Sequence, residues 1–96
     1  MIKGNKRRFE KDISLFLEEK PQDRILQCVA PLCAKQYGVL PISLSSDGDV
    51  LHVIARKETA VPTPFVLRGV LGKQIKIEGY VAFDVWDRAY KRFYGE

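Results

Sequence analysis

The chain has 96 residues, which is enough for one domain with a single modest core. A hydrophobic content of 46% and a charged content of 29% are typical of a globular chain and exclude an intrinsically disordered one. No apolar run approaches the roughly 18 residues that a membrane-spanning helix needs. Because acidic residues follow the basic N-terminus where a signal peptide would be apolar, we expect a cytoplasmic protein.

The net charge of +4 raises the question of nucleic-acid binding, and basic residues gather early, between Lys3 and Lys11. Acidic residues follow them at once, however, and no aromatic side chain lies between Lys3 and Arg8. We therefore expect the solvated start of a helix and no nucleic-acid partner.

The first predicted element is an amphipathic helix over residues 6–19, followed by Lys20-Pro21, which ends it. Its apolar side chains recur at helical spacing and form one stripe: Phe9, Ile13, Phe16 and Leu17. Two interpretations stay open. Residues 1–20 are an arm that docks on a partner, with Arg7 and Arg8 as its basic flank, or the stripe covers the sheet of the domain that residues 21–96 form.

A second helical region is predicted over residues 22–37, with Pro31 in its middle. A proline there kinks the helix or occupies the first turn of a new short helix, and we prefer the second interpretation. Gly38 is expected to end the helix with a left-handed cap. The two cysteines of this region, Cys28 and Cys33, do not have Cys-x-x-Cys spacing, so we expect free thiols.

Alternating apolar residues predict strands at 39–44 and 50–55, joined by turn residues at 45–49 into an antiparallel hairpin. Because proline cannot donate a ladder hydrogen bond, Pro41 indicates that the first strand lies at an edge of the sheet or pairs on one side only at that residue.

A loop should follow the hairpin, and then a short helix over residues 64–71 with Gly72 at its end. A third strand is predicted at 74–78, broken by Gly79, and a right-handed crossover makes it parallel to the second strand. Asp84 is expected to cap the last helix, over residues 85–94. The predicted fold is α+β: a small three-stranded mixed sheet, with an antiparallel hairpin and a parallel strand reached through a helical crossover, covered by helices.

Residues with catalytic or metal-binding chemistry are few. No phosphate-binding Gly-x-x-x-x-Gly-Lys loop is present, and a single imidazole and two thiols leave no set of metal ligands. His52 lies mid-strand, where we expect a hydrogen-bonded residue on a sheet face, since its sequence neighbours offer no acid or nucleophile. We therefore expect no enzyme, no cofactor and no metal.

Several segments together resemble a known family. They are Pro31-Leu32-Cys33-Ala34, Tyr37-Gly38-Val39-Leu40-Pro41-Ile42, the hairpin to residue 55, Gly72 before Ile75-Lys76-Ile77, and the closing Ala89-Tyr90-Lys91-Arg92-Phe93-Tyr94-Gly95. The chain is similar to the N-terminal domain of the type II secretion and type IV pilus assembly ATPases. The resemblance implies a non-catalytic docking domain that precedes a P-loop ATPase in the same natural chain. The implied partner is the cytoplasmic domain of an inner-membrane secretion or pilus assembly protein, at the inner face of a bacterial inner membrane.

Some relatives of that family bind cyclic di-GMP through repeated Arg-Leu-Gly-x-x-Leu motifs, which makes a nucleotide-binding regulatory domain the alternative. Arg7-Arg8-Phe9 stands where such a motif would begin, but its glycine is absent, and Ile25-Leu26-Gln27 matches the motif's ending only in part. Without the turn at that glycine and the guanidinium that stacks on a guanine, nucleotide binding loses its main contacts. The alternative therefore rests on the basic groups of Arg7 and Arg8 alone.

Overall fold

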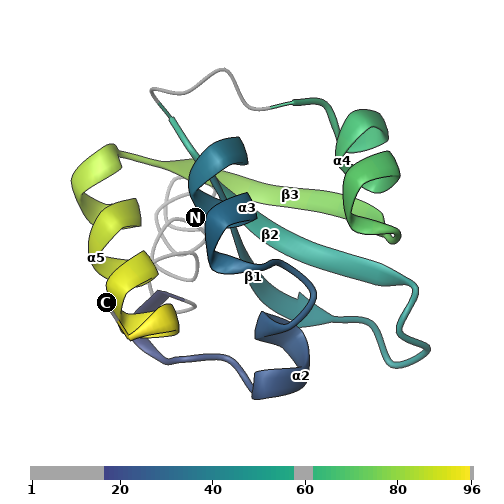
Figure 1. Cartoon of the computed structure of the whole chain (residues 1–96), viewed down its shortest axis with the longest axis horizontal. Coiled ribbons are helices and arrows are strands. Elements are labelled where there is room, and N and C mark those ends of the chain that lie inside the picture. The colour runs from purple at the N-terminus through teal and green to yellow at the C-terminus, as the bar shows by residue number, and fades with distance from the viewer. Residues whose placement is uncertain (1–16, 58–61, 96) are drawn as a thin grey trace, which may run out of the picture.

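The computed structural model describes residues 17–57 and 62–95. Its elements, labelled as in Figure 1, follow in chain order: α2 (Asp23–Leu26), α3 (Pro31–Tyr37), β1 (Val39–Leu44), β2 (Val50–Arg56), α4 (Pro64–Leu71), β3 (Gln74–Val81) and α5 (Phe83–Tyr94). The helix predicted over residues 6–19 lies outside the described residues, apart from its last few positions.

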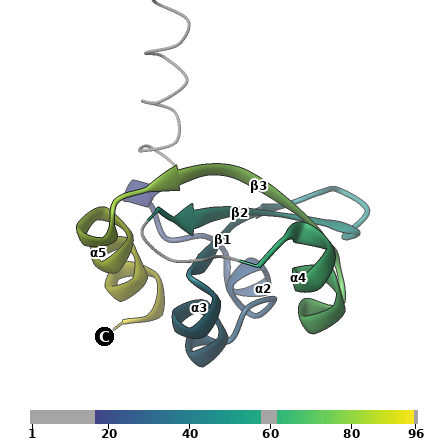
Figure 2. The same cartoon turned by 90° about the horizontal axis from the view of Figure 1, so that it is seen from above.

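The described strands form one mixed sheet in the order β1-β2-β3. β1 and β2 are antiparallel, and β2 and β3 are parallel because the chain crosses between them through α4. This confirms the predicted α+β fold. Figure 2 shows the labelled helices on one side of the sheet, with α4 and α5 near its opposite ends.

The position of β1 at an edge of the sheet agrees with the prediction from Pro41. The pairing register with β2 shifts between Pro41 and Ser43, so one extra residue of β1 is accommodated as a bulge. Pro41 is nevertheless buried, and both α2 and α3 contact β1.

The predicted end of the third strand was wrong. β3 does not break at Gly79 but continues to Val81. The register shows why, since Ile77 is opposite Val53 and Gly79 is opposite Ile54, which leaves Glu78 as an extra residue in β3. Glycine here accompanies a bulge inside the strand, which is the other role that an isolated glycine takes in a strand.

Two helix boundaries test the capping predictions. Pro31 begins α3, as preferred, and Gly38 ends it with φ 71°, in the left-handed region. The prediction that Asp84 caps the last helix was wrong, because α5 begins at Phe83 with Ala82 at the N-cap position. Asp84 lies in the first helical turn instead, where its negative charge favours the positive end of the helix dipole.

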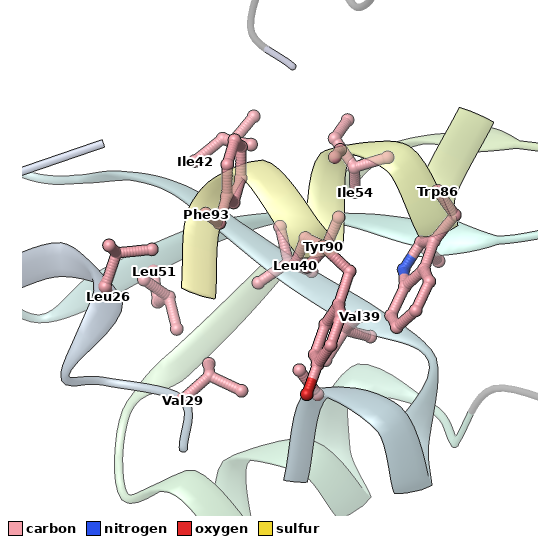
Figure 3. Packing of buried hydrophobic residues seen from close by; sticks show 14 of the residues in the cluster. Leu26, Val29, Val39, Leu40, Ile42, Leu51, Ile54, Trp86, Tyr90 and Phe93 are labelled. Carbon is pink, nitrogen blue, oxygen red and sulfur yellow. The ribbon is translucent and has the colours of Figure 1, made fainter. Parts of the chain in front are cut away.

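The core is a single cluster that joins the sheet to α5 and α2. Figure 3 shows the aromatic side chains of α5 in one cluster with aliphatic side chains of β1 and β2. Trp86 and Tyr90 stack with ring centroids 5.4 Å apart. The indole Nε1 of Trp86 is buried and has no hydrogen-bond partner among the described residues. The Tyr94 hydroxyl donates to the Val29 carbonyl over 2.8 Å, and burial raises the pKa of this phenol.

Candidate functional site

Of the residues predicted to contact a partner, the structure describes Leu17. Its side chain is 3% exposed and belongs to the core. Its carbonyl accepts a hydrogen bond of 2.6 Å from Nη1 of Arg92 in α5. Arg7, Arg8, Phe9, Ile13 and Phe16 lie outside the described residues. Leu17 therefore holds the start of the described chain against α5, and its side chain is not available to a partner.

Exposed apolar side chains gather instead on the crossover helix α4. The six large hydrophobic residues that are exposed in the described part of the chain include three from this eight-residue helix. They are Phe65, 81% exposed, Val66, 49% exposed, and Val70, 46% exposed. Only Leu67 of α4 is fully buried, so most of the helix's apolar surface faces outward.

Helical spacing explains how these residues share a face. Leu67 and Leu71 lie one turn apart on the side that contacts the sheet, and Leu71 is half-buried. Phe65 and Gly69, and likewise Val66 and Val70, are separated by four residues and project from the side away from Leu67. We call these four residues, Phe65, Val66, Gly69 and Val70, the outer face of α4. A surface helix normally carries polar residues on this side, and α4 carries one polar side chain in all, that of Arg68.

Gly69 stands in the middle of the outer face, and nothing in residues 17–57 and 62–95 gives a structural reason for a glycine there. Its φ is not positive, so its backbone does not require glycine. A Cβ atom built at Gly69 would meet nothing within 4 Å. Glycine inside a helix costs about 0.5–1 kcal/mol relative to alanine, and nothing in the described fold compensates for that cost.

The position of α4 is set by its ends and by β3. The Thr63 hydroxyl accepts a hydrogen bond from the Val66 amide over 3.3 Å, which caps the start of the helix. Gly72 ends the helix with φ 77°, and its amide bonds to the Arg68 carbonyl. The helix packs mainly against β3. The outer face is therefore presented by a helix that is fixed at both ends.

The other two exposed aromatic residues are Tyr80, near the end of β3, and Phe83, which begins α5. Figure 1 shows α5 at the end of the sheet away from α4. There the guanidinium of Arg56 lies 5.4 Å from the Phe83 ring centroid and 4.8 Å from that of Trp86. This cation–π arrangement ties the end of β2 to the start of α5. Because Phe83 already contacts Arg56, this group is a weaker candidate for a binding surface than the outer face of α4.

The structure gives His52 a carboxylate neighbour that its sequence neighbours did not offer. Nδ1 of His52 lies 2.5 Å from Oε2 of Glu78, on the adjacent strand β3, and both side chains are partly exposed. His52 is opposite Lys76 in the parallel register, and Glu78 lies two residues further along the same strand, so pairing of β2 with β3 brings together positions 26 residues apart. Among the described residues, no group of three or more His, Cys, Asp and Glu side chains could hold a metal ion. The thiols of Cys28 and Cys33 are free and half-buried.

Comparisons with known proteins give no match: no family model, no curated protein and no solved structure is significantly similar to the chain. Within residues 17–57 and 62–95, no helix is long and apolar enough to cross a membrane.

Proposed function

We propose that the chain is a non-catalytic docking domain that binds the cytoplasmic domain of an inner-membrane protein. The observation that carries this proposal is the outer face of α4, where Phe65, Val66 and Val70 are exposed together on a helix with a single polar side chain. Contiguous apolar surface of this kind marks interaction sites in globular proteins. The resemblance to the N-terminal domain of secretion and pilus assembly ATPases supports the same class of function.

The resemblance also suggests where the domain works. In the proposed arrangement it precedes a P-loop ATPase in the natural chain and brings that motor to an assembly protein at the inner face of a bacterial inner membrane. The fold itself is compatible with many functions, so the surface carries more of the proposal than the topology does.

A binding measurement tests the proposal. The full chain is titrated with the purified cytoplasmic domain of the assembly protein from the same bacterium, and isothermal calorimetry records the heat. We expect saturable binding with a negative heat-capacity change, because apolar surface is buried on docking. Absence of binding at protein concentrations near about 1 mM would refute the docking function for this partner.

The alternative, a cyclic di-GMP-binding domain, depends on Arg7 and Arg8, which lie outside the described residues. It predicts a saturable shift in melting temperature on adding the nucleotide, abolished by Arg7→Ala or Arg8→Ala. No shift at millimolar nucleotide would end that alternative, whatever the outcome with the protein partner.

A further inference from the structure

We infer that the outer face of α4 receives an α-helix of the docking partner, which crosses α4 at Gly69 and carries carboxylates beside an apolar stripe. This inference rests on the proposed docking function and adds to it the site and the kind of element that binds there. Three independent features of the described residues carry it.

The first feature is the shape and apolar character of the surface. Phe65 stands 81% exposed beside Gly69, while Val66 and Val70 form a ridge one turn long on the other side of that glycine. A side chain that enters between them would contact apolar atoms on both sides. Helices recognise one another when side chains of one pack between side chains of the other in this way.

The second feature is Gly69 itself. Open space surrounds the position of its missing Cβ, so no contact with a described residue explains its presence in a helix. A glycine on the face of a helix allows the backbone of a second helix to approach closely, as small residues do where helices cross. An external helix that crosses at Gly69 gives this residue a role that the domain alone does not.

The third feature is charge. α4 contains no acidic residue, and the side chain of Arg68 is exposed at the rim, three positions from Phe65. Beyond the end of the helix, Arg68 lines a small hollow together with Asp49 and Lys73, whose charges cancel each other. Two copies that packed these faces together antiparallel would bring Arg68 toward Arg68, whereas a partner helix with Asp or Glu beside its apolar stripe is complementary.

The experiment uses the full chain and the cytoplasmic domain named above as the probe, with four single variants. Phe65→Ser and Gly69→Ala alter the outer face, Arg68→Glu reverses the rim charge, and Arg88→Glu is the control. Arg88 has the same chemistry on α5, and its side chain is 72% exposed. We expect at least tenfold weaker binding for the first three variants and less than twofold change for Arg88→Glu. Added salt should weaken binding of the wild type and strengthen binding of the Arg68→Glu variant, because the reversal turns an attraction into a repulsion and salt screens both.

Gly69→Ala separates a binding role from a structural one, because it should raise the melting temperature while it weakens binding. A photo-crosslinker at residue 65 should attach to a helical segment of the probe that contains Asp or Glu. If the probe binds wild type and the outer-face variants equally, docking stands and this inference is overturned.

The other outcomes are equally decisive. If the probe does not bind the wild type, the proposed function and this inference both fall. If sedimentation shows that the chain self-associates and Phe65→Ser abolishes it, the occupant is a second copy. If the chain binds phosphatidylcholine–phosphatidylglycerol vesicles through Phe65, the occupant is a lipid surface. Either result overturns the assignment of a partner helix.

Discussion

Two glycines near the end of α4 should respond in opposite directions to the same substitution. At both Gly69 and Gly72 a new Cβ would meet nothing within 4 Å, so neither alanine creates a clash. The two sites differ in backbone conformation. Gly72 has φ 77°, in the left-handed region, whereas Gly69 is helical and has no positive φ.

The expected magnitudes follow from this difference. Gly69→Ala removes conformational freedom from the unfolded chain without straining the helix, so the free energy of unfolding should rise by about 0.5–1 kcal/mol. Gly72→Ala places a Cβ in the left-handed region and should lower it by about 1–2 kcal/mol. For a domain of this size, 1 kcal/mol corresponds to about 4–8 °C in Tm.

Thermal and urea unfolding followed by circular dichroism would measure both variants against the wild type. Equal slopes in urea would show that the denatured states are comparable. The reasoning fails if Gly69→Ala lowers the stability of the isolated chain, since Gly69 would then serve a contact inside the domain. In that case its position on the outer face would no longer point to an external helix.

Three further predictions concern the core and the surface. Leu17→Ala should lower the free energy of unfolding by about 2–4 kcal/mol, because the side chain is 3% exposed in the core; a loss below about 0.5 kcal/mol in urea would contradict that packing. Phe65→Ser should change the free energy of unfolding by less than about 0.5 kcal/mol in the same assay, since the ring is 81% exposed. A larger loss would mean that the ring packs on the domain. The raised pKa of Tyr94 means that the folded state keeps its proton longer than the unfolded state, so stability should fall as the pH rises above about 10. In Tyr94→Phe, the free energy of unfolding should fall less steeply with pH than in the wild type, by up to about 1.4 kcal/mol per pH unit. Urea unfolding at pH 9–11.5 measures this difference, and the same pH dependence in both proteins would refute the assignment.

Local rules predicted most elements because the residues that begin and end them act locally. Pro31 begins α3 and Gly38 ends it, and both roles depend on backbone geometry that these residues fix or permit by themselves. The same rules failed where one residue type is compatible with two structural roles. Gly79 could end a strand or accompany a bulge, and only pairing with β2 decides between them. An aspartate is favourable both at an N-cap and in the first turn of a helix, and Asp84 lies in the first turn of α5.

The candidate surface was harder to predict, because exposure depends on the direction in which a short helix docks. The spacing of Val66, Leu67, Val70 and Leu71 indicates one apolar face, but the contact with β3 divides it. Leu67 is buried and Val66 and Val70 are not. The contact between His52 and Glu78 could not be predicted for a related reason, because it depends on the pairing register of two strands whose residues are 26 positions apart.

The way α4 is held bears on how a partner would bind. Its start is capped by Thr63, its end by Gly72, and Leu67 anchors its middle, so the outer face should not need to rearrange on docking. When a surface is preformed, affinity depends on its contacts and their desolvation. Most substitutions in the outer face should then change the dissociation rate. Thr63→Ala tests this point, because it removes the cap on the Val66 amide without changing any side chain of the outer face. If the surface is preformed by the cap, this variant should slow association with the probe, whereas Phe65→Ser should mainly speed dissociation; identical kinetic effects of the two would refute preorganisation.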